Sequence, residues 1–240
     1  MGKDIDAEMM MSFDLSPLDW AALLWFLVAW LGYDALSPRV SVAGRSINDS
    51  MKKVRFEWMI EMLQREMRMA DASLVGHTIS SVTFSASTTM IVIAGLVGVL
   101  GDIGQAYNVA SGLRFAAPMS QSLFESKVLV ITGVFVVAFF RFSWSLRQYN
   151  YLCALIGAAP SPREKRMHKR AALELAKLMT LAVTSFNQGL RSYYFALCVL
   201  VWIAGPGWFA LATLGVVAVL LRHHYGSAAA RLITAHAVKR

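Results

Sequence analysis

The side chains with the greatest chemical potential in this sequence are hydroxyls placed inside an apolar segment. From His77 the chain reads HTISSVTFSASTT, with eight serines and threonines in thirteen residues. At about 100° per residue, four of these side chains fall on one helical face: His77, Ser81, Ser85 and Thr88. Such a stripe indicates either close helix packing, with hydroxyls bonded to their own backbone, or the wall of a wet path.

A second polar group lies in the segment FFRFSWSLRQYNY, where Arg141, Ser145 and Gln148 share one stripe. An arginine in hydrocarbon costs at least about 2.5–3.5 kcal/mol on insertion scales, so it faces protein, water or the headgroups. We expect this stripe to form the second wall of a polar path. Arg147 points elsewhere, and Arg191 opens a later apolar segment, so we assign both to a basic inner face.

Residues for enzyme chemistry are scarce. The sequence has no Ser/His/Asp order, no paired intramembrane carboxylates and no glycine loop for phosphate. Its two cysteines and five histidines do not follow a metal-ligand spacing. We therefore predict a protein that is not an enzyme and needs neither a metal nor a cofactor.

The composition excludes an ordinary soluble domain. Hydrophobic residues make up 57% and charged residues 16% of the chain, against about 45–50% and about 25% in soluble domains. The net charge of +8 comes from lysines and arginines in blocks between apolar runs. This pattern fits the cytoplasmic face of a membrane protein better than a nucleic-acid surface.

The apolar runs predict an all-α membrane protein with five spans. A transmembrane helix needs about 20 apolar residues, and the candidates are residues 18–36, 77–100, 128–148, 189–204 and 208–223. The last two form a hairpin, because Gly205-Pro206-Gly207 interrupts an apolar stretch too long for one span. The loop over 101–127, which includes Asp102, is expected to be the least regular part.

The basic residues orient these spans. With the N-terminus outside, only Lys3, Arg114 and Lys127 of the 23 lysines and arginines fall outside, which leaves 20 inside. We therefore expect an acidic external tail over 1–17, a membrane domain over 18–225 and a basic cytoplasmic tail over 226–240. The expected location is a bacterial inner membrane.

Two cytoplasmic segments, 48–71 and 163–188, are expected to be helical. Asn48 is a plausible cap for the first, Glu61 and Arg65 form an i,i+4 pair, and Ser161 with Glu164 forms a capping box for the second. At least one of these helices should continue into the span that follows it.

Several segments resemble a known family. They are FRFSWSLRQYNYLCALIGAAP, FSASTTMIVIAG, FNQGLRSYYFAL and the pattern of Asn48, Arg55, Trp58 and Met59. Over about residues 20–225 the chain resembles domain-of-unknown-function family 599, membrane proteins of bacteria and plants. The resemblance implies a multi-pass membrane protein and supplies no catalytic residue.

These observations lead to two functional hypotheses. The first is a channel or passive pathway, formed by several copies of the chain, for a small ion (an anion is favoured) or a polar solute. The alternative is a membrane scaffold or assembly factor that binds a partner or anionic lipid through its basic cytoplasmic helices. Because polarity lies inside the membrane, the sequence favours the channel. Expected partners are the lipid bilayer and further copies of the chain, without nucleic acid.

Overall fold

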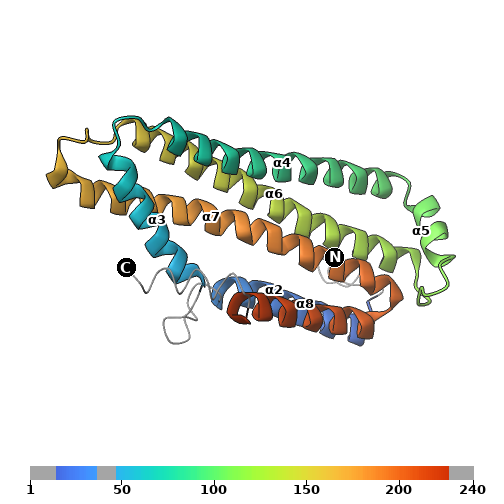
Figure 1. The fold of residues 1–240 in the computed structure, drawn as a ribbon. Helices are drawn as coiled ribbons and strands as arrows, with labels where there is room; N and C mark the ends of the chain where they lie inside the picture. Colours follow the sequence, from blue (N-terminus) through green and yellow to red (C-terminus); the bar gives the residue numbers. More distant parts are fainter. Residues whose placement is uncertain (1–14, 37–46, 227–240) are drawn as a thin grey trace, which may run out of the picture. The chain divides into compact units, whose positions relative to one another are not determined.

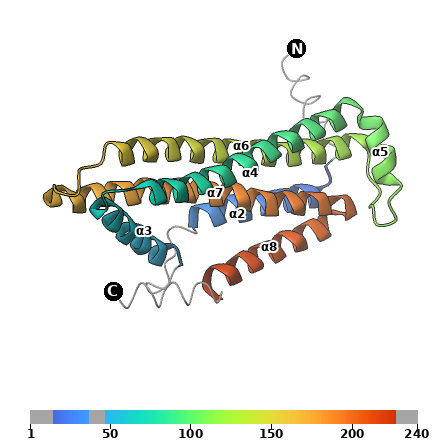
Figure 2. The ribbon, with the colours of Figure 1, turned by 45° about the horizontal axis from the view of Figure 1, so that its top comes forward.

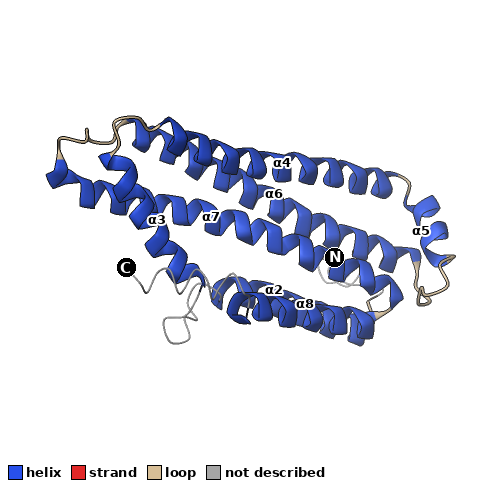
Figure 3. Cartoon of the chain, viewed as in Figure 1, coloured by secondary structure: helices blue, strands red, loops and turns tan. Residues whose placement is uncertain are grey.

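The computed structural model describes residues 15–36 and 47–226, and all regular elements in these ranges are helical. They are α2 (Pro17–Leu36), α3 (Ile47–Gln64), α4 (Met69–Gly101), α5 (Ile103–Ser111), α6 (Gln121–Gly157), α7 (Lys165–Val201), the 3-10 turn η2 (Trp202–Ala204) and α8 (Pro206–Gly226) (Figures 1 and 3). The all-α prediction is confirmed for this part of the chain. The expected tails lie outside it, except for residues 15–17 and 226.

The chain forms two compact units, and four helices contribute substantially to both. Unit 1 comprises Met1–Ala35, Thr89–Val137 and Arg191–Ala218, and unit 2 comprises Leu36–Thr88, Ala138–Leu190 and Val219–Arg240. Helices α4, α6, α7 and α8 therefore each supply one part to unit 1 and another to unit 2.

Aromatic rings form the core of unit 1. Phe26 of α2 lies 5.2 Å from Phe209 of α8 between ring centroids, and the Phe209 ring stacks on Trp202 at 4.8 Å. Phe195 of α7 meets Phe26 edge-on at 5.8 Å. All four side chains are buried. Such pairs stabilise beyond their buried area, so they fix α2, α7 and α8 to one another.

Aliphatic, thioether and aromatic side chains form the core of unit 2. Each of its four main helices buries residues from one face. The fully or almost fully buried apolar members are Met59, Met62 and Leu63 of α3, Val75 and Val82 of α4, Ala138, Phe142, Tyr149 and Leu152 of α6, and Ala172, Leu175 and Ala182 of α7. Helix α3 is thus a packed part of the fold and not a loose surface segment.

Two expectations about the segment 48–71 fail. The segment 48–71 is not one helix, because α3 ends at Gln64 and α4 begins at Met69 after a short turn (Figure 2). Arg65 does not pair with Glu61 as expected. Its Nη1 lies 2.7 Å from Oδ1 of Asp71, which also accepts a 2.6 Å bond from Nε1 of Trp58. The turn brings the buried carboxylate of Asp71, in α4, back to Trp58 of α3 and to Arg65 in the turn itself.

The other helix boundaries follow the sequence more closely. Helix α7 runs without a break from Lys165 to Val201, so the helix expected over 163–188 does continue into the following apolar segment. The break at Gly205 is also confirmed. Gly205 has φ +122°, a left-handed value that favours glycine, and Pro206 begins α8. Proline suits this first position because its missing N–H would have no helical partner.

The loop expected over 101–127 contains a helix that the sequence reasoning missed. Asp102 caps α5, because Oδ1 of its side chain accepts a 3.3 Å hydrogen bond from the backbone N–H of Gln105. Figures 1 and 2 show α5 turned away from the direction of α4. Only the stretch between Gly112 and Ser120 is irregular.

Two of the described helices, α4 and α6, are long and apolar enough to cross a membrane. In their most apolar 18-residue windows, only 17% of α4 and 44% of α6 is buried. The core helix of a soluble protein would bury most of such a window. Helix α8 offers a shorter apolar stretch, Pro206–Arg222. Five spans remain a prediction.

Candidate functional site

The polar stripe on α6 faces α7. Nη1 of Arg141 donates to the carbonyl of Gln188 at 3.1 Å, and the hydroxyl of Ser145 donates to the carbonyl of Ala182 at 2.8 Å. Oε1 of Gln148 accepts a 3.1 Å bond from the hydroxyl of Ser185. Ser145 and Gln148 are buried, and Arg141 is partly buried. The three residues thus share a stripe as expected, and their contacts favour helix packing over a wet wall.

A glycine allows α6 and α7 to approach closely beside this stripe. A Cβ atom added to Gly189 would lie within 2.8 Å of three ring atoms of Phe142, which is completely buried. No real Cβ contact is that short. The absence of a side chain at Gly189 is therefore what lets Phe142 fill the space between the two helices.

The stripe on α4 is arranged differently. The hydroxyl of Ser81 donates to the carbonyl of His77 at 3.2 Å, and that of Ser85 donates to the carbonyl of Ser81 at 3.0 Å. His77 and Ser81 are exposed, whereas Ser85 and Thr88 are half-buried. A hydroxyl has one donor hydrogen, so the exposed side of Ser81 presents an acceptor. Because anions bind to hydrogen-bond donors, a surface that presents acceptors does not favour anion binding.

The two residues assigned to the basic inner face differ in environment. Arg147 is exposed, and its place on an inner face stays a prediction. Arg191 is not an exposed charge: its Nε lies 2.8 Å from Oδ1 of Asp34 on α2, and the two side chains are only 16% and 7% exposed. The guanidinium also lies 5.5 Å from the ring centre of Tyr33. The expectation failed because the carboxylate partner lies 157 positions away along the chain.

Unit 1 contains a further buried polar network that the sequence reasoning missed. Nε1 of Trp202 donates to Oδ1 of Asp19 at 2.7 Å, and Nζ of Lys127 donates to the carbonyl of Trp202 at 3.0 Å. Asp19 and Lys127 are both buried. Ionisable residues within apolar segments usually have a specific partner, and this general signal would have marked Asp19, Asp34 and Lys127.

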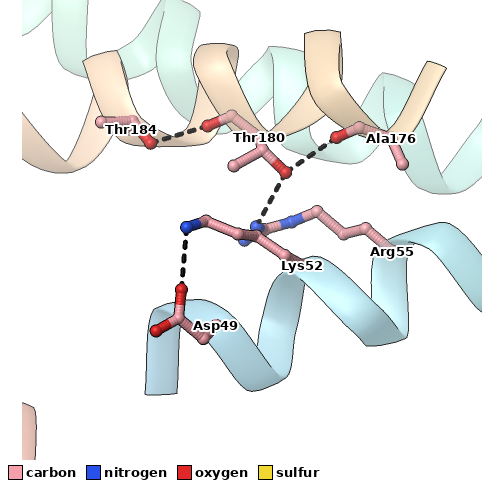
Figure 4. Close-up of polar contacts among 6 residues, drawn as sticks. All are labelled: Asp49, Lys52, Arg55, Ala176, Thr180 and Thr184. Carbon is pink, nitrogen blue, oxygen red and sulfur yellow. Dashed lines mark hydrogen bonds and ion pairs between the residues drawn. The ribbon is translucent and has the colours of Figure 1, made fainter. Parts of the chain in front are cut away.

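A second missed feature is the contact of α3 with α7. Arg55 is buried, and its Nη1 donates to the hydroxyl of Thr180 at 3.3 Å (Figure 4). The Thr180 hydroxyl in turn donates to the carbonyl of Ala176 at 2.7 Å. Burial lowers the pKa of Arg55, and nearby Tyr149 partly offsets this effect. The guanidinium stays protonated even so, because arginine side chains are not deprotonated in proteins.

An apolar groove of about 440 Å³ lies beside this contact. It is lined by Lys52, Phe56, Leu173, Ala176, Lys177, Thr180 and Leu181. Figure 4 shows Lys52 and Arg55 both extending from α3 toward α7, with Nζ of Lys52 2.8 Å from Oδ1 of Asp49. Its volume falls in the range of small-molecule sites, about 300–1,000 Å³. We call this feature the α3–α7 groove.

Fold and site together define a helical protein with two largely unburied helices that could cross a membrane. The family model described as "Protein of unknown function, DUF599" matches residues 21–229, and the chain belongs to this family. No curated protein and no solved structure matches it significantly.

Proposed function

We propose that this protein is a polytopic membrane scaffold that binds anionic lipid through a helical platform on the inner side of a bacterial membrane. The platform consists of α3 and of α7 up to Ala182. Five spans carry it: α2, α4, α6, the last part of α7, and α8. At about 1.5 Å per residue, the 20-residue helix α2 reaches about 30 Å, the thickness of the hydrocarbon core.

The observation that carries this proposal is the α3–α7 groove. Its lining is mostly apolar but includes two exposed lysines, Lys52 and Lys177. Basic groups next to the cytoplasmic leaflet attract anionic lipids, each by about 1 kcal/mol. The polar residues of α6, by contrast, are engaged with α7 and leave little lining for a path through a single chain.

One observation favours a second candidate, the pathway formed by several copies. Most of α4 is unburied, and its exposed surface includes His77 and Ser81. A second copy of the chain is one way to cover a surface that carries hydroxyls within the membrane. Since the exposed side of Ser81 offers an acceptor, such a path would suit a polar solute or a cation better than the anion that the sequence favoured.

Purification and reconstitution distinguish the two candidates. For the scaffold, lipid extracted from the protein purified in mild detergent should be enriched in anionic phospholipid relative to the source membrane. Vesicles containing the protein should leak ions and small solutes no faster than empty vesicles.

Protein-dependent flux would instead support the pathway. Flux that falls in Ser85→Leu and in Arg141→Gln, but not in the off-stripe control Ser80→Leu, would contradict the scaffold. Absence of anionic lipid enrichment would contradict it as well.

A further inference from the structure

The α3–α7 groove combines two properties that suit one kind of ligand. Phe56, Leu173, Ala176 and Leu181 give it an apolar lining that water wets poorly. Lys52 and Lys177, one from each helix, add two ammonium groups, and both side chains are exposed. An amphipathic molecule with an apolar chain and an anionic head satisfies both properties at once.

The positive charge of the groove is only partly neutralised. Asp49 pairs with Lys52, but the pair is exposed, at 51% and 36% for the two side chains, and such pairs contribute only about 0–1 kcal/mol. An ammonium has three donor hydrogens, so Lys52 can bind a second anion without losing Asp49. Among the described residues, Lys177 forms no ion pair.

Arg55 adds a third, buried charge behind Thr180. Its polar contact is the 3.3 Å bond to the Thr180 hydroxyl, and no carboxylate of the described chain lies within ion-pair distance. The buried hydroxyl of Tyr149, a neighbour of Arg55, has no hydrogen-bond partner in the described ranges. A buried cation without a counter-charge is costly, so an anion held in the adjacent groove would offset part of that cost.

The groove also lies at the depth of lipid headgroups in the proposed topology. The bonds from Ser145 to Ala182 and from Ser185 to Gln148 place the inner end of the third span level with residues 182–185 of α7. From that level the groove runs inward along α7, and at 1.5 Å per residue Lys177 lies about 8 Å further and Leu173 about 14 Å further. The headgroup region of a bilayer occupies about 5–8 Å on each side of the hydrocarbon core. The part from Leu181 to Lys177 is therefore the part at headgroup depth, and Leu173 lies beyond it.

We infer that the α3–α7 groove binds an anionic phospholipid from the surrounding bilayer. The phosphate lies between Lys52 and Lys177, and the upper part of an acyl chain covers Phe56 and Leu181. This inference rests on the proposed scaffold, since it assigns the lipid of that proposal to one specific site.

The test compares a groove variant with a variant of equal charge outside the groove. The full-length protein, Lys52→Gln/Lys177→Gln and the control Lys53→Gln/Lys169→Gln are each titrated in detergent with phosphatidylglycerol, and bound lipid is counted by native mass spectrometry. The control also removes one exposed lysine from each of α3 and α7. We expect the groove variant to bind on the order of tenfold more weakly and the control to bind nearly as the wild type does. Phosphatidylcholine should bind weakly to all three.

Two further measurements distinguish the lipid from other ligands. Leu181→Gln should also weaken binding, because Leu181 is exposed and contributes only apolar lining. Millimolar inorganic phosphate should not displace the lipid. Displacement by phosphate together with an unaffected Leu181→Gln variant would show a site for free phosphate and overturn the inference.

Equal losses in the groove and control variants would show diffuse surface charge and overturn the inference too. The scaffold proposal would survive that result, provided that purified protein still retains anionic lipid. A wild-type protein without preference for phosphatidylglycerol would refute both.

Discussion

Asp34→Ala is expected to destabilise the protein by about 3–5 kcal/mol, the usual cost of removing one partner of a buried ion pair. Asp34 and Arg191 are 2.8 Å apart and largely buried, so the substitution leaves the Arg191 charge without its carboxylate. Within an apolar environment water cannot replace that partner. The free energy of unfolding, measured by denaturant titration in detergent micelles, gives the size of the loss.

The control for this prediction is an exposed pair of the same type. Arg170 and Glu174 are 3.2 Å apart with side chains 87% and 58% exposed, and Glu174→Ala should cost less than about 1 kcal/mol. The double variant Asp34→Asn/Arg191→Gln, which removes both charges, should recover part of the stability. An Asp34→Ala variant as stable as Glu174→Ala would contradict the structural role of this pair.

Gly189→Ala is expected to destabilise the packing of α6 on α7 by about 1–3 kcal/mol, the usual cost of overfilling a packed core. The added methyl group would overlap Phe142, two of whose ring atoms would lie 2.7 and 2.8 Å from it. Gly189→Leu should prevent stable folding. The measurement is again the denaturant midpoint in micelles, with helicity followed by circular dichroism.

A helical glycine with free space around it provides the control for Gly189. An added Cβ at Gly133 of α6 meets nothing within 4 Å, so Gly133→Ala should be neutral or stabilising by up to about 1 kcal/mol. Gly189→Ala/Phe142→Leu should be more stable than Gly189→Ala alone, because the smaller side chain restores space. Equal midpoints for Gly189→Ala and Gly133→Ala would show that the helices do not pack as closely as described.

Features that depend on neighbouring residues could be predicted from the sequence. Gly205 and Pro206 interrupt the helix because of their own backbone preferences. The continuous helix α7 follows from a long stretch without glycine or proline up to Gly189 and from its capping residues. The family resemblance likewise depends on contiguous segments and is confirmed over residues 21–229.

Features that depend on distant partners could not be predicted. The sequence spacing of Arg141, Ser145 and Gln148 places them on one face of α6, but it does not reveal that α7 packs against that face. The sequence likewise does not show that Arg191 forms a buried ion pair with Asp34, because only the fold brings the two residues together.

The turn after Gln64 has the same cause. At this turn the Asp71 carboxylate accepts hydrogen bonds from both Trp58 and Arg65, whereas the local sequence alone favours a continuous helix.

The α3–α7 groove could not be predicted from the sequence either. Arg55 and Trp58 belonged to the pattern that carried the family resemblance, yet their spacing does not reveal their contacts. Trp58 binds Asp71, and Arg55 reaches Thr180, 125 positions away. Two helices must first pack together before an apolar lining and two lysines form one groove.

Single-cysteine accessibility tests most directly whether this chain crosses a membrane with its platform on the inner side. With Cys153 and Cys198 replaced by alanine, Ser161→Cys and Ser111→Cys each provide one exposed thiol, before α7 and at the end of α5. An impermeant maleimide applied to intact cells should label Ser111→Cys at once, and Ser161→Cys only after the membrane is permeabilised. Labelling of Ser161→Cys in intact cells, or release of the protein from membranes by alkaline carbonate, would contradict the account.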